Sequence, residues 1–335
     1  LKVFGTRWAS SNSQSRTLSS QYTLQQASGM SENDLILYHY PASPYAEKVR
    51  LLASCLDVPW RSVEVAIQPP RNTLALLAGG YRRIPVMQIG ADIFCDTAII
   101  SEEIIDCSKQ TLAACDDGSQ ALAQRAETDV FFAAIRQNSP LKTALGLTWM
   151  LGLKGMMAFA KDRASFSAGH KPAEQSPAAA KRVFREFLND LEQQLVGKRY
   201  VSGASPSLSD FCCYHPIFLA QGFKSIKPHQ IPETVRSWMT RMAEIGWGDY
   251  ANVEASDALE IAKMQDPRSL PSVDVAHEDV GEWVTVTPTD TARVPVTGTL
   301  VSLSAERIII ARRSEDVGLC HIHFPRQGFT CERIR

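Results

Sequence analysis

The stretch from Leu35 to Ser54, LILYHYPASPYAEKVRLLAS, joins a strand pattern to a helix pattern and decides the fold. The apolar run 35–40 predicts a buried strand of about six residues, which Pro41 ends. Apolar residues then recur at helical spacing over 45–56, so one face of a helix packs against a core. Between the strand and the helix, Ser43 is a favourable N-cap residue and Pro44 suits the first helical position.

Ser43 has two interpretations. In the simpler one, its hydroxyl only caps the helix. In the other, the free amides and the positive end of the helix dipole attract an anion to this position, and a thiolate is such an anion. A serine at this position can fill both roles.

The segments that follow extend the pattern into a sheet with helices on both faces. Residues 60–67 predict a second strand, and residues 71–78 predict a short helix that Gly79-Gly80 ends. Residues 84–89 and 91–95 predict a hairpin around Gly90, and helical spacing resumes at Asp96. The order β-α-β-α-β-β-α within about eighty residues is typical of a thioredoxin-like mixed sheet.

The rest of the chain changes character twice. Between Leu122 and Lys263 we find helical spacing and no strand-like alternation, which predicts an all-helical bundle. Within it, Ser207 and Asp210 have the spacing of a capping box. After Val273, short β runs are split by proline, glycine and serine, which predicts a small barrel, a sandwich or an add-on sheet.

These patterns divide the chain into four parts. The predicted fold class is an α/β thioredoxin-like domain plus an all-α bundle, followed by a small all-β domain. The predicted boundaries are a basic, serine-rich tail over 1–31, a thioredoxin-like domain over 32–110, an all-helical domain over 115–268 and a small β domain over 273–335.

Composition excludes several function classes. A net charge of −1 over 335 residues leaves no basic excess for nucleic-acid binding. The eight cysteines show no Cys-x-x-Cys spacing, which favours a reducing compartment over a disulfide scaffold. The most apolar stretch, 144–160, is interrupted by Lys154 and three glycines, so we expect membrane contact only through partners.

The first thirty-one residues contain no Asp or Glu, whereas acids make up about a tenth of the whole chain. Lys2, Arg7 and Arg16 are scattered among eight serines. This composition resembles an organellar targeting segment, so we expect a mitochondrial or plastid location. An ordinary N-terminal tail and a cytoplasmic location are the alternatives.

Three motifs in register carry a family resemblance. Ser43-Pro44-Tyr45-Ala46-Glu47-Lys48-Val49-Arg50 follows the first strand, Arg83-Ile84-Pro85-Val86 precedes the third, and Asp96-Thr97 follows the hairpin. With them, residues 34–107 resemble the N-terminal domain of a glutathione S-transferase. Ser205-Pro206-Ser207-Leu208-Ser209-Asp210 resembles the capping signature of that family's helical domain, whose typical members end before the C-terminal β runs.

The resemblance implies a glutathione site. The backbone of Ile84, presented by a cis bond to Pro85 beside Arg83, would pair with the cysteinyl part of glutathione. Asp96 would hold the γ-glutamyl ammonium, and Thr97 with nearby amides its carboxylate. Ser43 would hydrogen-bond the sulfur and favour the thiolate, which attacks an electrophile.

Two functions therefore stay open. The first is glutathione-dependent transfer to a small electrophile, with a pocket formed by helical residues near Trp149 and Met156. Because Ser43 stands where disulfide-exchanging relatives have cysteine, thiol transfer is disfavoured. The second is a non-catalytic accessory subunit or adaptor of a larger organellar protein complex. The resemblance separately implies a homodimer, whose usual interface the extensions could block or replace.

The run Cys320-His321-Ile322-His323 is the one other candidate site. Its two histidines share a face at strand spacing, but a zinc site needs further ligands and no nearby motif supplies them. The sequence therefore predicts no metal and places both histidines on a solvent face.

Overall fold

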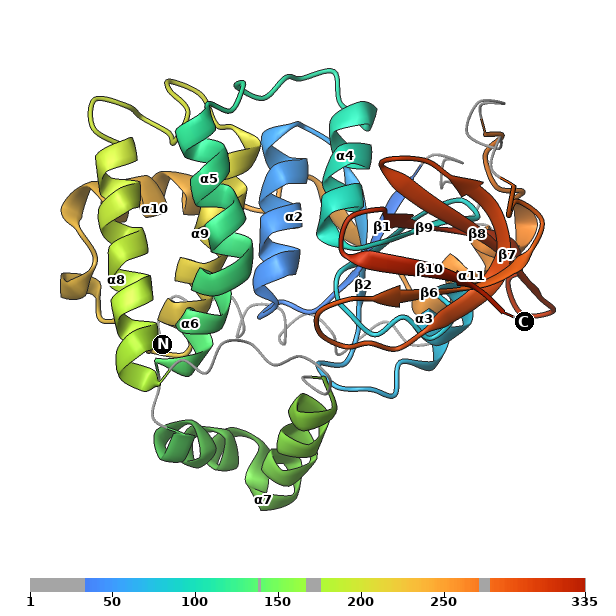
Figure 1. The fold of residues 1–335 in the computed structure, drawn as a ribbon, viewed down its shortest axis with the longest axis horizontal. Helices are drawn as coiled ribbons and strands as arrows, with labels where there is room; N and C mark the ends of the chain where they lie inside the picture. The colour runs from blue at the N-terminus through green and yellow to red at the C-terminus, as the bar shows by residue number, and fades with distance from the viewer. Residues whose placement is uncertain (1–33, 138–139, 167–175, 271–277, 335) are drawn as a thin grey trace.

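The fold is described from a computed structural model, which covers residues 34–137, 140–166, 176–270 and 278–334. The expected targeting tail over 1–31 lies outside these residues. Figure 1 shows a group of helices on one side, a β module on the other, and the first strands between them. None of the helices in the described ranges is both long enough and apolar enough to cross a membrane.

The N-terminal part has the predicted thioredoxin-like order. Its strands are β1 (Leu35–His39), β2 (Trp60–Glu64), β3 (Val86–Ile89) and β4 (Asp92–Cys95), and its helices are α2 (Pro44–Cys55), α3 (Asn72–Leu77) and α4 (Thr97–Cys107). Strand β1 pairs with β2 in parallel and with β3 in antiparallel fashion, and β3 pairs with β4 in antiparallel fashion. The fold class predicted from the spacing is therefore confirmed for this part.

Alternation along β1 builds two cores, one on each face of the sheet. Leu35 and Leu37 belong to the core shared with α2, α4 and the helical bundle. Ile36 and Tyr38 belong to the core on the opposite face, under α3 and the β module. Because a strand points successive side chains to opposite faces, a fully apolar β1 requires cover on both sides.

The helical part follows in the chain. Its elements are α5 (Asp117–Arg125), a π-helical turn η2 (Ala126–Val130), α6 (Phe131–Arg136), α7 (Pro140–Phe166), α8 (Pro177–Gln194), α9 (Leu208–Gly222), a 3₁₀ turn η3 (Pro228–Gln230) and α10 (Glu233–Ile245). Helix α7 is broken at Gly152, whose φ of 70° and ψ of 171° are not helical. Figure 1 shows α7 lying apart from the bundle formed by the other helices.

One strand in this region was not predicted. Strand β5 (Tyr250–Asn252) pairs with β2 in parallel, and helix α11 (Ala255–Met264) follows it. All three β5 residues are exposed, so edge pairing holds the strand and burial does not. The prediction of no strand between Leu122 and Lys263 is therefore wrong here, because an exposed three-residue strand leaves no alternation to detect.

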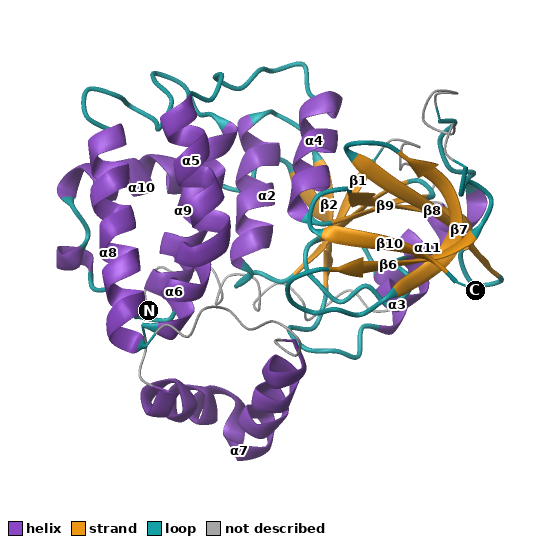
Figure 2. Cartoon of the chain, viewed as in Figure 1, coloured by secondary structure: helices purple, strands orange, loops and turns teal. Residues whose placement is uncertain are grey.

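The C-terminal residues form an add-on sheet. The strands are β6 (Trp283–Pro288), β7 (Val296–Leu303), β8 (Arg307–Ser314), β9 (Gly318–Pro325) and β10 (Phe329–Arg333). Strand β9 pairs with β4 in parallel, which gives one ten-stranded sheet of order β10-β6-β7-β8-β9-β4-β3-β1-β2-β5. Figure 2 shows the strands of this module gathered on the side away from the helical bundle.

A buried guanidinium fixes the loop that joins β1 to α2. Arg50 Nη2 donates to the carbonyl of Pro41 at 2.9 Å and to Glu47 Oε2 at 2.7 Å. Its Nη1 lies 2.8 Å from His39 Nδ1 at the end of β1. Since Arg50 can only donate, His39 must accept at Nδ1 and carry its proton on Nε2. The loop that carries Ser43 is thus tied to the strand and to the helix on either side of it.

His215 of α9 is a second fully buried histidine next to α2. Its ring centroid lies 4.7 Å from that of Tyr45 and 5.7 Å from that of Phe131. Burial lowers the pKa of His215 to about 3, and burial with the nearby charge of Arg50 lowers the pKa of His39 to about 2. Both imidazoles are therefore neutral in the folded chain at ordinary pH.

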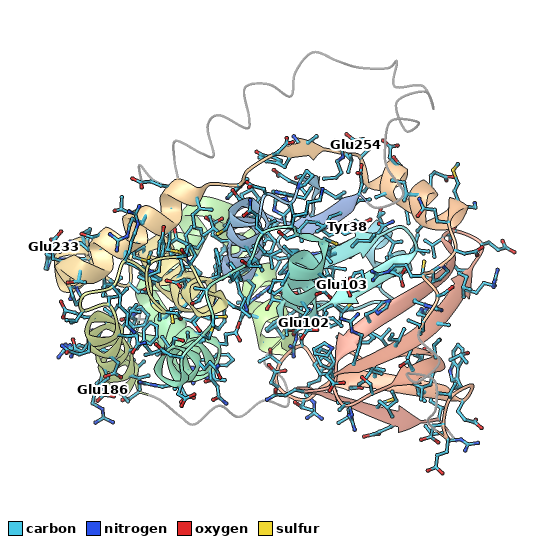
Figure 3. The ribbon with its side chains drawn as sticks, turned by 90° about the horizontal axis from the view of Figure 1, so that it is seen from above. Tyr38, Glu102, Glu103, Glu186, Glu233 and Glu254 are labelled. Carbon is cyan, nitrogen blue, oxygen red and sulfur yellow. The ribbon has the colours of Figure 1, made fainter. Side chains whose placement is uncertain are left out.

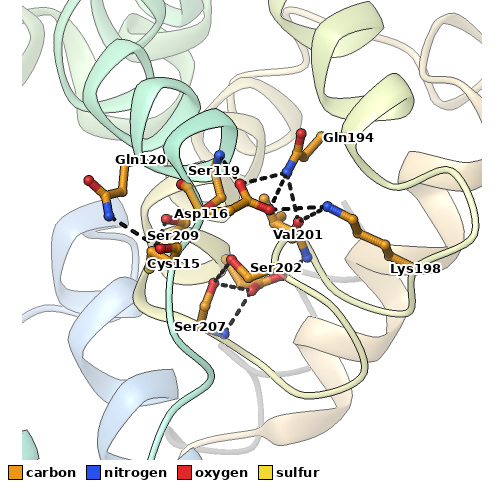
Figure 4. A network of polar contacts seen from close by, with 11 residues as sticks. Cys115, Asp116, Ser119, Gln120, Gln194, Lys198, Val201, Ser202, Ser207 and Ser209 are labelled. Atoms are coloured by element: carbon orange, nitrogen blue, oxygen red, sulfur yellow. Dashed lines mark hydrogen bonds and ion pairs between the residues drawn. The ribbon is translucent and has the colours of Figure 1, made fainter.

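The predicted cap of α9 is present. Asp210 Oδ2 accepts from the Ser207 amide at 2.8 Å and from the Ser207 hydroxyl at 2.8 Å, and Ser207 also bonds the hydroxyl of Ser202. Asp210 Oδ1 accepts from the Val201 amide and from Trp238 Nε1, each at 2.8 Å. Figure 4 shows Ser202, Ser207 and Val201 drawn together around this cap. One buried carboxylate therefore connects a turn, the start of α9 and α10.

We expect Asp210→Ala to lower the free energy of unfolding by at least about 3 kcal/mol, since it leaves several donors buried and without an acceptor. Urea unfolding followed by circular dichroism measures this change. The control is Asp190→Ala, which removes a half-exposed carboxylate paired with Arg125 and should change the value by about 0.5 kcal/mol or less. Equal effects of the two substitutions would contradict the role given to Asp210.

The buried histidines predict acid sensitivity. Histidine in the unfolded chain has a pKa of about 6.5, whereas the pKa values of His39 and His215 in the folded chain lie well below that value. Below about pH 6.5, unfolding therefore takes up protons. Above about pH 6.5 the two histidines do not lower the free energy of unfolding. Below that pH, each of them lowers the free energy of unfolding by up to about 1.4 kcal/mol for each unit that the pH falls.

Substituting His215 tests this in isolation. Between about pH 6 and pH 5, His215→Phe should flatten the pH dependence of the unfolding free energy by about 1 kcal/mol. The matched substitution His229→Gln removes an exposed histidine on η3 and is the control for losing an imidazole as such. An unchanged slope in His215→Phe would show that this imidazole is protonated in the folded chain.

Candidate functional site

Sheet register brings the three predicted motifs to the same end of the sheet. Tyr38, near the end of β1, pairs with Val86 at the start of β3, and Val86 pairs with Cys95 at the end of β4. Ser43 follows β1, Arg83 to Pro85 precede β3, and Asp96 follows β4. Segments separated by more than fifty residues in the chain thus meet where the strands end.

Ser43 is the N-cap of α2. Its Oγ accepts a hydrogen bond from the Ala46 amide at 3.2 Å, and its own amide donates to the Tyr40 carbonyl at 3.0 Å. The side chain is buried, and no described residue accepts its hydroxyl proton. The capping interpretation is present in the geometry, and the hydroxyl keeps a proton that it can donate to a ligand.

The bond between Ile84 and Pro85 is cis, as the resemblance implied. Ile84 precedes β3 and is half-buried against the core under the β module. Among the described residues, none hydrogen-bonds to its amide or carbonyl. The backbone of Ile84 is therefore available for pairing with an extended ligand, in the way one strand pairs with another.

Asp96 has an unusual backbone conformation, with φ of 100° and ψ of 142°. L-residues rarely adopt such values, and strained residues of this kind concentrate at functional sites. Its Oδ1 caps α4 by accepting from the Ala98 amide at 3.1 Å, while Oδ2 lies 3.4 Å from Arg83 Nη1. Burial raises the pKa of Asp96, and the Ala98 amide and the Arg83 charge oppose this shift.

Thr97 is the first residue of α4 and is nearly buried. Its carbonyl accepts from the Ser101 hydroxyl at 2.7 Å. The residue stands at the positive end of the α4 dipole, where amides of the first turn bind anions. Asp96 and Thr97 together thus place a carboxylate acceptor beside a helix N-terminus, which suits a zwitterion.

Arg83 connects this site to the β module. It forms an ion pair with Asp290 and donates to the Thr291 carbonyl at 2.6 Å, both in the loop between β6 and β7. Its bond to Asp96 is much longer at 3.4 Å, so the Asp96 carboxylate is only loosely held. The buried Nε of Arg83 has no partner among the described residues. The sequence did not predict that Asp290 and Thr291 contact Arg83, because no local pattern relates them to a residue more than two hundred positions earlier.

A buried ion pair lies behind α2 and was also missed. Lys48 pairs with Glu127 of η2, and both are close to Cys212 of α9. Burial raises the pKa of Cys212 to about 12, so this thiol is neutral and Glu127 supplies the charge that keeps Lys48 protonated. The sequence did contain one sign of this buried pair. Lys48 is a charged residue three positions after Tyr45, on the helix face that was predicted to be apolar.

Tyr45 joins this pair to the site. Its ring packs against Phe131 with a centroid distance of 4.7 Å. Burial raises the pKa of its hydroxyl, and the charges of Glu127 and Asp96 raise it further. Tyr45 is therefore neutral. The charges of Glu127, in the buried pair, and of Asp96, in the candidate site, both act on its hydroxyl.

The expected electrophile pocket near Trp149 and Met156 is described only in part, because the side chain of Trp149 lies outside the described residues. Met156 is half-buried on α7. Asp162 of α7 pairs with Arg82, at 2.5 Å, directly beside Arg83. The Phe166 carbonyl at the end of α7 accepts from the Ala292 amide at 2.6 Å. Helix α7 is thus anchored next to the candidate site.

Comparisons with known proteins agree with this geometry. A family model described as glutathione S-transferase, N-terminal domain, matches residues 37–109. A solved GST-like protein from Pseudomonas syringae is 29% identical over 89% of this chain and 99% of its own, with a TM-score of 0.67. Residues 1–270, which precede the β module, make up only about four-fifths of this chain, whereas the match covers 89% of it. The likeness therefore extends into the β module. Among curated proteins, none matches the chain.

Two further solved structures are less similar. Gtt2 from Saccharomyces cerevisiae is 19% identical over 63% of this chain and 97% of its own, with a TM-score of 0.45. A glutathione transferase family member from Pseudomonas fluorescens, solved with two glutathione bound, is 14% identical over 65% of this chain and 92% of its own, also at 0.45. The family model and the P. syringae structure show that this chain has a glutathione S-transferase N-terminal domain over residues 37–109 and a GST-like fold, whose sheet continues into a C-terminal β module.

Proposed function

We propose that this protein binds glutathione and transfers it to an electrophile. The observation that carries the proposal is the strained Asp96 at the start of α4, whose Oδ2 has only a 3.4 Å contact with Arg83. Strain of this kind persists where surrounding structure over-determines it, and a loosely held carboxylate is ready to accept a new donor. An ammonium group forms charge-assisted hydrogen bonds with a carboxylate, and these are roughly twice as strong as bonds between neutral groups.

Each part of glutathione then has a partner. The γ-glutamyl ammonium binds Asp96, and its carboxylate binds the Thr97 hydroxyl and the amides at the start of α4. The cysteinyl amide and carbonyl pair with the backbone of Ile84 next to the cis bond to Pro85. Arg83 supports the carboxylate of Asp96 from the other side, and Asp290 holds Arg83 in place.

Ser43 acts on the sulfur. Its hydroxyl donates a hydrogen bond to the thiolate, and the N-terminus of α2 adds a favourable dipole. Both effects favour the ionised form and lower the thiol pKa from a free value of about 8.5. The thiol proton leaves to solvent as the thiolate forms. The thiolate then forms the new sulfur–carbon bond, and either a leaving group departs from that carbon with the bonding electron pair or an activated C=C bond opens and takes up a proton from solvent.

The second candidate function is a non-catalytic adaptor. The observation that favours it is the exposed apolar surface of α7, where Leu153 is 63% and Met157 61% exposed. An adaptor would use the inherited fold as a scaffold and would not need glutathione. The binding experiment below therefore separates the two functions.

We expect calorimetric titration of the full chain with reduced glutathione to show one site, and Asp96→Asn to weaken binding at least about 10-fold through loss of a charge-assisted hydrogen bond. Asparagine keeps the cap on α4, so the fold is retained. The control is Asp116→Asn, which changes the equivalent cap of α5 with its 2.7 Å bond to Ser119. No heat from folded protein at millimolar glutathione would favour the adaptor.

Ser43→Ala tests the thiolate. The ultraviolet absorbance of bound glutathione against pH should give a thiol pKa below about 8.5 in the wild type, and a value close to 8.5 in Ser43→Ala. Ser176→Ala is the matched control, because Ser176 caps α8 with the same 3.2 Å bond to an amide. If both variants retain the wild-type thiol pKa, Ser43 only caps its helix.

A further inference from the structure

The junction between β4 and β9 brings together three side chains that the glutathione site does not use. In the parallel pairing of these strands, Asp92 is opposite His321 and Phe94 is opposite His323. His321 and His323 are two positions apart on β9, so they point to the same face. The sequence predicted that this face is exposed to solvent, and it is not: the side chains of Asp92, His321 and His323 are 1%, 13% and 2% exposed.

The three groups converge on one point. His323 Nε2 lies 2.7 Å from Asp92 Oδ1, and His321 Nδ1 lies 4.0 Å from the same oxygen. One potential ligand atom from each residue lies within 4.8 Å of the others. Two imidazoles and one carboxylate are therefore arranged as a set of nitrogen and oxygen donors, although Asp92 is far from the two histidines in sequence.

This cluster contains unmatched buried nitrogen atoms. The Nδ1 atoms of His321 and His323 are both buried and have no hydrogen-bond partner among the described residues. At 4.0 Å, His321 Nδ1 is too far from Asp92 Oδ1 for a hydrogen bond. A buried nitrogen without a partner costs free energy. A cation between His321 and Asp92 would provide a partner for His321 Nδ1.

Neighbouring groups orient the ligands. Asp92 Oδ2 accepts from the Arg268 amide at 2.9 Å and from Arg268 Nε at 3.3 Å, which leaves Oδ1 directed at the histidines. The His323 ring stacks on Phe94 with a centroid distance of 4.6 Å. Outer contacts of this kind fix ligand geometry in metal sites.

The positive charges beside the cluster are compensated. Arg268 Nη2 bonds Glu103 Oε2 at 3.0 Å, and Arg307 Nη1 bonds Glu103 Oε1 at 2.7 Å. Arg307 also lies 3.4 Å from Glu102. Figure 3 labels Glu102 and Glu103 on α4, the helix that borders the β module. The two arginines therefore do not leave an unbalanced positive charge against an incoming cation.

A cavity gives access. Its volume is about 390 Å³, and its walls include His323, Glu103, Arg268 and Ser302. It is separate from the glutathione residues, none of which line it. A water molecule entering from this cavity can occupy a coordination position that the protein leaves open.

We propose that Asp92 Oδ1, His321 Nδ1 and His323 Nε2 bind one divalent transition-metal ion of the zinc class, with water as a further ligand. Imidazole and carboxylate donors suit zinc, and three protein ligands leave a position open. Zinc–ligand distances of about 2.0–2.2 Å place tetrahedral ligand atoms about 3.4 Å apart, so the observed spacings of 2.7 Å, 4.0 Å and at most 4.8 Å would change by up to about 1.4 Å. The ion would join β9 to β4 and so fasten the β module to the thioredoxin-like sheet.

The test uses the full chain after removal of metal with a chelator. We expect titration with Zn²⁺ to show one equivalent per chain, and His321→Gln to weaken it at least about 10-fold. The Asp92–His323 hydrogen bond stays intact in this variant, so the fold is retained, which circular dichroism checks. His229→Gln is the matched control, because His229 is exposed on η3, and it should bind as the wild type does.

Co²⁺ absorption separates this site from the cysteines. Binding at the cluster should give the visible bands of a nitrogen and oxygen site without the thiolate charge-transfer band that exposed Cys107 would add. Cys107→Ser should leave these bands unchanged. No Zn²⁺ binding by the wild type, or equal binding by wild type and His321→Gln, would overturn the proposal and leave Asp92 and His323 as a hydrogen-bonded pair only. Glutathione binding is not a readout, so either proposal can fail alone.

Discussion

The parallel pairing of β4 with β9 is the interaction on which the rest of the architecture depends. In the order β4-β3-β1-β2, strand β4 is an edge, and an exposed edge presents unpaired amides and carbonyls. Strand β9 covers that edge and brings β8, β7, β6 and β10 with it. The side chains of β9 that face away from the histidines, Cys320, Ile322 and Phe324, then complete the core that Ile36 and Tyr38 begin. The module therefore shares a core with the thioredoxin-like part.

The same pairing determines what the module contributes to the candidate site. Once β9 is fixed against β4, the loop between β6 and β7 lies close enough for Asp290 and Thr291 to contact Arg83. Arg83 in turn lies against Asp96. The β module thereby helps to fix the position of Arg83, the residue directly before the cis bond between Ile84 and Pro85.

Two buried ion pairs among the described residues lie beside the helix that carries Ser43. Arg50 with Glu47 fixes the loop before α2, and Lys48 with Glu127 joins α2 to η2. Burying such charges costs about as much as their attraction returns, so the pairs contribute geometry more than net stability. Removing one partner is nevertheless expensive, because the other charge stays buried alone. The rigid placement of Ser43 follows from this requirement.

Local patterns allowed the sequence to predict most of the fold. Strand β1, the cap at Ser43, the hairpin around Gly90 and the capping box at Asp210 each depend on residues close together in the chain, and all are present. The contacts that were missed join distant segments: β5 with β2, Asp290 with Arg83, and Asp92 with His323. Periodicity reports which face of an element is buried and does not report which element buries it. His321 and His323 are an example. The sequence correctly predicted that they share one face of a strand, but it wrongly predicted that this face is exposed to solvent.

Strand β4 links the two proposed sites, because Asp92 is its first residue and Asp96 follows its last. Over about four residues at 3.3 Å each, the two carboxylates are on the order of 13 Å apart along the strand. Coupling across such a distance requires an element with two alternative arrangements. Strand β4 is paired on both sides, with β3 and β9, which restrains its movement. The proposed metal at Asp92 should therefore affect how firmly β9 is held more than it affects the proposed binding of glutathione at Asp96. On this reasoning the β module supports the proposed glutathione site through the position of Arg83 and does not regulate it.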